Sequence, residues 1–262
     1  MENFKLTGDY HTHTVYSHGK GTIEDNVKAA RERGLKAIAI SDHGFSHPAF
    51  GITKKKALKM RAEIDGLKEK YGDIEILMGI ESNLRGRSGI TDLKEDYYQY
   101  FDLFLVGFHK FILYESISDW FNFFGKNFFC DKFKIKPSES LIEKNTKAYI
   151  NAIKKYPIDA ITHINYCVFS DAVEVAKAAR DYGTYIELNA KKTHISDEEL
   201  NKIAQTGVRF IISSDAHSPQ RVGDSELVER LLERTDIDKK LIDNIDGRKP
   251  SFRFAAFKRS KL

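Results

Sequence analysis

The chain has 262 residues, enough for one large α/β domain with a substantial buried core. Its composition is 41% hydrophobic and 31% charged, and a net charge of only +4 argues against a dedicated nucleic-acid binder. Two cysteines, Cys130 and Cys167, cannot build a disulfide framework, so we expect a reducing, cytoplasmic setting.

The hydropathy and the two ends predict no membrane partner. No apolar run reaches the roughly 18 residues that could span a bilayer. The first five residues lack the apolar core of a signal peptide. The last three, Ser-Lys-Leu, match a peroxisomal address, which we interpret as a chance ending of a basic tail.

Short runs rich in β-branched and apolar residues alternate with amphipathic stretches along the whole chain. The predicted strands cover residues 5–10, 36–41, 74–80, 101–108, 159–163, 185–188 and 209–213. Such alternation predicts a mainly parallel sheet covered by helices. Seven strands are one fewer than in the common eight-stranded barrel. We see no linker, so we expect a single domain over residues 1–262.

Local signals mark where the predicted helices begin and end. Thr22 with Asp25, and Ser196 with Glu199, have the capping-box spacing, in which each side chain serves the other residue's free backbone donor. Pro157 predicts a helix end just before the fifth strand. Left-handed residues are expected to close four other helices, at Gly34, Gly72, Gly183 and Gly207.

One segment interrupts this alternation. An aromatic-rich insertion at about 110–137 follows the fourth strand and shows little periodicity. It is interpreted either as a lid or aromatic wall beside an active site, or as an excursion that packs on the barrel or pairs with another subunit.

Histidines and acidic residues recur where the predicted strands end. In a parallel barrel, the C-terminal ends of all strands meet on one face, so these side chains should converge there. The His11 and His13 pair on the first strand can reach one ion, because alternate residues of a strand point the same way. The nine predicted metal ligands are His11, His13, His18, His43, Glu81, His109, His163, Asp215 and His217.

The ligand types narrow the choice of metal. Imidazoles mixed with carboxylates suit zinc, manganese or iron, whereas an all-oxygen set would suit magnesium or calcium. Nine ligands exceed what one four- to six-coordinate ion needs. We therefore expect two or three divalent metals, with at least one bridging carboxylate.

These motifs, in this order, resemble those of the PHP (polymerase and histidinol phosphatase) family over about residues 6–245. They are His11-Thr12-His13-Thr14, Ser41-Asp42-His43-Gly44, Gly79-Ile80-Glu81, Gly107-Phe108-His109, Thr162-His163, Glu187-Leu188-Asn189 and Ser214-Asp215-Ala216-His217. The resemblance implies a distorted seven-stranded (β/α)7 TIM-like barrel with a trinuclear metal centre. The chain departs from many members in its fifth motif, which reads Thr162-His163-Ile164-Asn165 where they have Ser-His-Pro, and in its longer insertion.

The resemblance also implies roles for the ligands. Glu81 would bridge two metals, one held with His11, His13 and Asp215 and the other with His109 and His163. His18, His43 and His217 would hold a third. Glu81, Asp215 and His217 are thereby predicted to be catalytic.

The predicted reaction is hydrolysis of a small phosphomonoester, with histidinol phosphate and nucleotides as candidate substrates. A hydroxide bridging two metals is expected to attack phosphorus in line with the ester oxygen. Predicted substrate contacts are Lys110, Arg85 and Asn189, with Arg87, Lys191 and Arg221 as further cations near the strand ends.

Several supporting residues are open to more than one interpretation. Asp42 and Asp9 could orient a ligand imidazole or only brace a turn. His47 and His194 match no motif and are expected to be surface residues.

Two other enzyme classes remain open. An amidohydrolase-type C–N hydrolase also uses His-x-His on its first strand, but it leaves His18, His43 and His217 without a role. A DNA exonuclease of the PHP type is the second alternative, although no concentrated basic stripe supports it.

Overall fold

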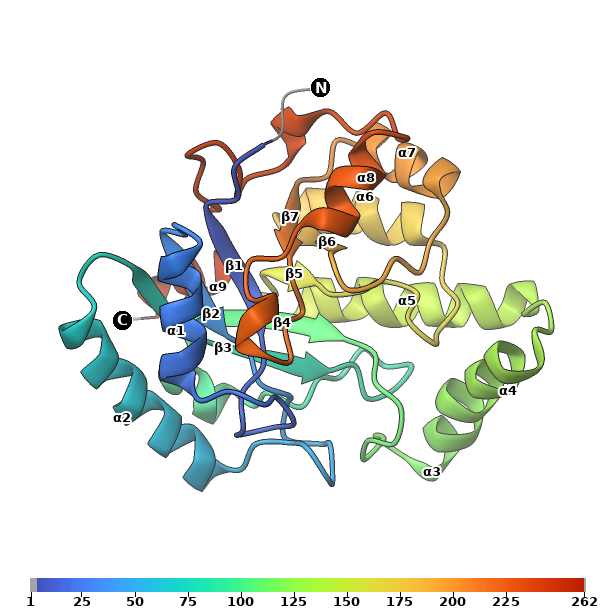
Figure 1. Cartoon of the computed structure of the whole chain (residues 1–262). Helices are drawn as coiled ribbons and strands as arrows, with labels where there is room; N and C mark the ends of the chain where they lie inside the picture. The colour runs from blue at the N-terminus through green and yellow to red at the C-terminus, as the bar shows by residue number, and fades with distance from the viewer. Residues whose placement is uncertain (1–3, 262) are drawn as a thin grey trace.

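The computed structural model describes residues 4–261, so part of each end discussed above lies outside it. Seven parallel strands pair in chain order and curve into a nearly closed barrel (Figure 1). A parallel bridge between Thr12 and Ala216 brings the first strand beside the chain that follows the last. The strands are β1 (Gly8–Thr12), β2 (Ala37–Ile40), β3 (Glu75–Asn83), β4 (Leu103–Gly107), β5 (Ala160–Ile161), β6 (Tyr185–Asn189) and β7 (Phe210–Ser213). The predicted distorted seven-stranded TIM-like barrel is thus confirmed.

Helices connect the strands and cover the outside of the barrel (Figure 1). The α-helices are α1 (Ile23–Glu32), α2 (Lys54–Lys70), α3 (Ile117–Asp119), α4 (Lys126–Phe133), α5 (Glu139–Lys155), α6 (Ala172–Tyr182), α7 (Asp197–Gln205), α8 (Glu226–Leu232) and α9 (Arg253–Ser260). Short 3-10 turns are η1 (Glu95–Tyr100), η3 (Pro219–Arg221) and η4 (Lys239–Leu241), and η2 (Trp120–Gly125) is a π-helix. Within residues 4–261, no helix is long and apolar enough to cross a membrane.

The inner face of the sheet changes character along the strands. Toward their N-terminal ends, a buried cluster that includes Ala39, Leu105, Tyr185 and Ile211 fills the barrel. Because side chains alternate along a strand, the same face continues upward to polar residues. On β6, for example, Tyr185 is followed on that face by Glu187 and Asn189. The barrel therefore has an apolar layer nearer the N-terminal ends of its strands, which we call the floor. Its polar end, at the C-terminal ends of the strands, we call the upper end.

The first strand begins later than predicted. Leu6 forms an antiparallel bridge with Ile245, so the chain just before β1 pairs with the C-terminal region and reaches the start of β2 only through the Thr7 carbonyl. The β1–β2 register also shifts between Asp9 and Thr12, as at a β-bulge. The bulge changes the alternation, which lets His11 face the upper barrel although Tyr10 packs in its floor.

Most of the predicted helix boundaries are confirmed. Thr22 and Asp25 form the reciprocal capping box, whereas the side chain of Ser196 accepts from the Glu199 N–H and the return bond does not form. Left-handed Gly34, Gly183 and Gly207 follow their helices. The prediction for Gly72 is wrong. The α2 cap is Tyr71 at φ −121, and its hydroxyl donates to Glu24, which already fixes the helix end.

The aromatic-rich insertion forms α3, η2 and α4, which project from one side of the barrel (Figure 1). Phe123 is buried and meets Phe108 edge-on, with 5.2 Å between ring centroids. Trp120, Phe121 and Phe129 remain exposed. The segment thus packs on the barrel, as one interpretation expected, and its first residues, Lys110 and Phe111, line the pocket that holds the candidate site, as the other expected. The extent of the domain stays a prediction.

Candidate metal centre

Glu81 lies at the middle of the polar upper end, and its side chain is fully buried. Imidazoles from four other strands and the loops that follow them surround its carboxylate. The distances from a ring nitrogen to the nearest Glu81 oxygen are 2.6 Å for His163, 2.8 Å for His43, 3.1 Å for His109, 3.4 Å for His11 and 3.6 Å for His13. One carboxylate thus has contacts enough to be shared between metal ions.

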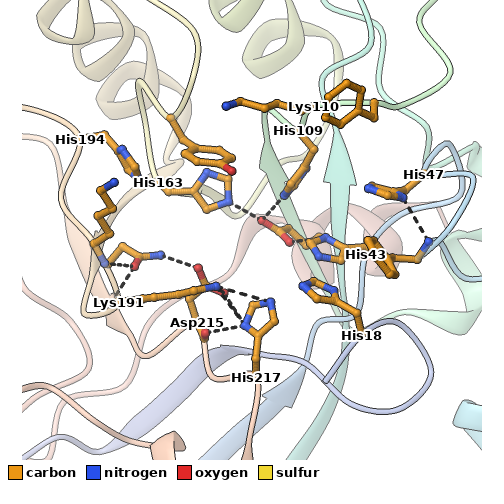
Figure 2. Close-up of a pocket in the computed structure, with 16 residues that line it drawn as sticks. His18, His43, His47, His109, Lys110, His163, Lys191, His194, Asp215 and His217 are labelled. Atoms are coloured by element: carbon orange, nitrogen blue, oxygen red, sulfur yellow. Dashed lines mark hydrogen bonds and ion pairs between the residues drawn. The ribbon is translucent and has the colours of Figure 1, made fainter. Parts of the chain in front are cut away.

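Asp215 forms a second acidic point close by. Its Oδ1 lies 3.4 Å from His13 Nε2 and 3.3 Å from His217 Nδ1. Figure 2 shows Asp215 and His217 on one side of the pocket, with His18 and His43 beside them. The ring centroids of His18 lie 4.3 Å from those of His217 and 4.7 Å from those of His43. All nine predicted ligands are therefore brought together.

Three compact groups within this nine-residue cluster could each hold an ion. Their potential ligand atoms lie within 4.8 Å of one another. The groups are His11 with His13 and Glu81, His43 with Glu81 and His109, and His13 with His43 and His217. The first contains three of the four residues expected to share one ion and lacks Asp215. His13 belongs to both the first and the third group, and His43 belongs to both the second and the third. The family resemblance does not imply this sharing.

Unpartnered buried atoms support the fit of this donor set to metal ions. Glu81 Oε2 and His43 Nδ1 are buried without a hydrogen-bond partner, although they lie 2.8 Å apart. Leaving such polar atoms unsatisfied is costly, so each needs an explanation. A cation between carboxylate and imidazole would satisfy both.

Electrostatics favour the protonation states that bind metals. Burial disfavours charge on Glu81, but His109, His11 and His43 outweigh it and hold the Glu81 pKa well below its ordinary value. Burial lowers the pKa of His43 to about 3 and that of His18 to about 4. An ionised carboxylate and neutral imidazoles are the forms in which these residues coordinate metals. His11 and His163 differ, since Glu81, Glu187 and Asp215 outweigh the burial of each ring and raise its pKa.

Backbone strain occurs at two of the predicted ligands. His163 has φ +29 and Asp215 has φ +48, in the left-handed region that non-glycine residues rarely adopt. Gly107, at the end of the neighbouring β4, leaves room for the His163 ring. A Cβ atom on Gly107 would lie 2.6 Å from His163 Cε1. Such strain persists only where the surroundings impose it, and it clusters at functional sites.

Glu187 is a buried member of the site to which the sequence reasoning assigned no role. Its Oε1 lies 2.7 Å from His11 Nδ1, and its Oε2 accepts a hydrogen bond from the backbone N–H of His163 at 2.8 Å. One carboxylate therefore orients two predicted ligands from different strands. The signal was present, because Glu187 shares a face of β6 with Asn189.

Asp9 and Asp42 brace the backbone around the site. Asp42 accepts from the Thr14 N–H, from the Thr14 hydroxyl and from Ser17, so it holds the loop after β1. Asp9 accepts from the Ser214 N–H and the Gly223 N–H, and so holds the loop after β7. Of their two interpretations, the bracing of loops is the one observed.

The cluster opens into a pocket of about 540 Å³. Of the predicted substrate contacts, Lys110 and Asn189 line it, as does Lys191. Arg85 does not. Its guanidinium donates to the carbonyls of Leu113 and Tyr114, because the chain after β4 folds over it. Arg87 and Arg221 likewise pair with acidic residues away from the pocket.

The expectation that His47 and His194 are surface residues is wrong. Both are half-buried and line the pocket. The His194 ring centroid lies 4.9 Å from that of Tyr166, and the His47 ring centroid lies 4.9 Å from that of Phe50. Aromatic neighbours from the connecting loops, which no strand motif reveals, hold them there.

A parallel barrel that gathers imidazoles and carboxylates at the C-terminal ends of its strands defines a class of metal-binding barrel proteins. A family model described as the PHP domain matches residues 9–192. The chain therefore belongs to the PHP family.

Curated relatives extend the match beyond that model. A probable phosphatase of Thermoanaerobacter sp. (strain X514) is 31% identical over 252 residues, which cover 92% of this chain and 91% of the relative. Another, from Caldanaerobacter subterraneus subsp. tengcongensis, is 32% identical over 92% of this chain and 87% of its own.

A solved structure shares the fold. It is the histidinol phosphate phosphatase of Lactococcus lactis, complexed with zinc, L-histidinol and phosphate. The TM-score is 0.59 at 15% identity, and the match covers 89% of this chain and 95% of that one.

Removing the charge of Glu187 is expected to weaken the centre without dismantling it. In Glu187→Gln, the amide can still accept one bond but no longer supports both His11 and His163. We expect a loss of about 10- to 100-fold in metal affinity, the range typical of residues that orient ligands. Titration with a chromophoric zinc competitor would measure it. Glu198→Gln, a matched change on an exposed helix position, should leave the affinity unchanged; equal affinities in the two variants would contradict the orienting role.

Proposed function

We propose that this chain is a metal-dependent phosphatase that hydrolyses a small phosphomonoester at the nine-residue cluster. Membership of the PHP family, with curated relatives named probable phosphatases, identifies a hydrolase that acts on phosphoester bonds. The observation that supports the proposal most is Glu81, a buried carboxylate among five imidazoles at the base of an open pocket. Neither rival enzyme class is favoured by any comparable feature.

We assign the nine residues to three proposed ions as the family resemblance implies. His11, His13, Glu81 and Asp215 would hold one, Glu81 with His109 and His163 a second, and His18, His43 and His217 a third. The contacts of His43 with Glu81 also allow it to serve the second. Such ions, zinc or manganese by ligand type with iron as a further option, neutralise phosphate oxygens and lower the pKa of a bound water.

Groups at the pocket wall can bind the phosphate itself. Lys191 reaches into the cluster, where its Nζ lies 3.3 Å from Asp215 Oδ1 and 3.1 Å from His217 Nδ1. An ammonium held there can donate to a phosphate oxygen. Asn189 has another task. Its amide donates to Glu187 and Asp215, and its oxygen accepts from two backbone N–H groups of the next loop, so it fixes the wall that carries Lys191.

A substrate panel on protein with quantified metal tests the proposal. We expect phosphate release from p-nitrophenyl phosphate and from sugar monophosphates, and none of the corresponding products from dihydroorotate or single-stranded DNA. Asp215→Asn serves as the inactive control. Hydrolysis of the amide or the DNA without phosphate release from any monoester would overturn the proposal.

A further inference from the structure

Beyond the cluster, the pocket carries a second group of polar side chains. Lys110, Tyr166, Lys192 and His194 line its outer wall, and we call these four residues the outer subsite. Tyr166 is the central member, with ring centroids 5.3 Å from His163 and 4.9 Å from His194. Lys110 Nζ lies 5.9 Å from the same ring. Figure 2 shows Lys110 and His194 on the His163 side of the pocket, away from His18 and His47.

The charges around this subsite are strongly one-sided. Within the described chain, Glu81 and Asp215 are the only carboxylates that line the pocket, and both belong to the cluster. Lys192 is exposed beside His194. Lys110 pairs with Asp131 at 3.5 Å, but Asp131 is shared with Lys134 at 3.2 Å. A net positive field therefore covers the outer wall.

His194 contributes a neutral donor to this wall. Burial, His163 and Lys192 together lower its pKa to about 4, so the ring carries no charge near neutral pH. Its N–H can still donate to an anion, as can the Tyr166 hydroxyl. Cations and neutral donors on one wall are what an anionic group requires.

The loop that carries Tyr166 is held in an unusual conformation. Asn165 and Cys167, on either side of it, have φ +65 and +54. The Asn165 side chain fixes the turn, because its Oδ1 accepts the Ser170 N–H at 3.0 Å and its amide donates to the Ser170 carbonyl at 3.1 Å. Left-handed residues of this kind cluster at functional sites, and the Asn165 bonds fix the place of Tyr166 in the pocket wall.

We propose that the outer subsite binds a second anionic group, carried by the leaving group of the substrate. The inference rests on the proposed phosphatase function and names its substrate class: phosphomonoesters that carry another phosphate or a carboxylate. Water cleaves the scissile P–O bond, giving inorganic phosphate and an alcohol that retains the second anion. An amine such as that of L-histidinol would instead face Lys110 and Lys192, so histidinol phosphate is disfavoured.

A series of six-carbon sugar 6-phosphates that differ in a second charged group tests the charge preference. Glucose 6-phosphate has no second charge, 6-phosphogluconate adds a carboxylate, glucose 1,6-bisphosphate adds a phosphate, and glucosamine 6-phosphate adds an amine. We expect kcat/KM for both anionic esters to exceed that for glucose 6-phosphate by roughly tenfold, the size of one charge-assisted hydrogen bond, and the amine to rank last. The better of the two anionic esters distinguishes phosphate from carboxylate as the group bound.

Charge reversal at the rim supplies the specific control. In Lys192→Glu, the preference for 6-phosphogluconate over glucosamine 6-phosphate should fall at least about tenfold. Lys126→Glu makes the same change on exposed α4, outside the pocket, and should leave the preference within twofold. Calorimetric binding of 3-phosphonopropionate and 3-aminopropylphosphonate, which cannot be hydrolysed, should show the same order.

The outcomes separate this inference from the proposed function. Phosphate release that ignores the second charge, or a preference that Lys192→Glu does not alter, would overturn the subsite while leaving the phosphatase intact. No phosphate release from any ester, p-nitrophenyl phosphate included, would overturn both.

Discussion

Replacing Glu81 with glutamine is expected to reduce phosphatase activity by more than about 100-fold. A roughly 100-fold loss is the upper end of the range for residues that only orient metal ligands. Glu81 is itself a predicted metal ligand, and its oxygens contact the imidazoles of the other predicted ligands directly. An ionised carboxylate offers two acceptor-only oxygens to the surrounding imidazoles, whereas an amide offers one oxygen and a donor NH2 group. The charge that neutralises a shared pair of ions is also lost. Phosphate release and bound metal per chain would be measured on the same preparation.

Glu75→Gln is the matched control for this variant. It makes the same substitution at the first residue of the same strand, where Glu75 pairs with Lys249 at the surface. Exposed ion pairs contribute little, so activity and metal content should not change. If Glu81→Gln kept both full metal content and most of its activity, Glu81 could not be the shared ligand. Urea unfolding of both variants would show whether any loss reflects folding.

The barrel is the part of the molecule that the sequence predicted best. Each predicted strand corresponds to an observed one, because hydrophobic runs bounded by glycine or proline report burial directly. The error at β1 shows the limit of this reasoning. Phe4 and Leu6 alternate with polar residues as in a strand, but Leu6 pairs with the distant Ile245. No local pattern reveals that partner.

The aromatic insertion resisted prediction for a structural reason. The π-helix η2 closes its turns from residue i to i+5, so its side chains do not repeat at the α-helical period. A search for a period of 3.6 residues therefore finds little order there. Its apolar side chains are also divided between a buried face and an exposed one, which composition alone cannot separate.

The candidate site was predictable to the extent that strand ends define it. Strand ends brought together all nine predicted ligands, although their metal roles stay a prediction. Glu187 stands in one of the motifs, but it falls inside the predicted strand at 185–188 rather than at its end, so no role was assigned to it. His47 and His194 reach the pocket from loops, and Arg85 is drawn away by carbonyls of the insertion. Loop geometry decided all three.

Removing the metals is expected to abolish activity and to destabilise the fold. The cluster places three buried carboxylates, Glu81, Glu187 and Asp215, among imidazoles in the upper barrel. Ions that bind only the folded chain stabilise it by mass action, by about 2.7 kcal/mol at a concentration 100 times the dissociation constant. After dialysis against a chelator, phosphate release should fall to background and the unfolding midpoint in urea should decrease. Zinc or manganese should restore both, with two or three ions bound per chain.

The add-back experiment distinguishes this centre from a magnesium-dependent one. Neutral imidazoles bind zinc and manganese better than magnesium or calcium, which prefer oxygen ligands. Magnesium at the same concentration should therefore restore neither activity nor stability, because six of the nearest donors to Glu81 and Asp215 are ring nitrogens. Zinc should also fail to rescue Glu81→Gln. Full activity in protein that retains less than about a tenth of an ion per chain would rule out metal-assisted chemistry.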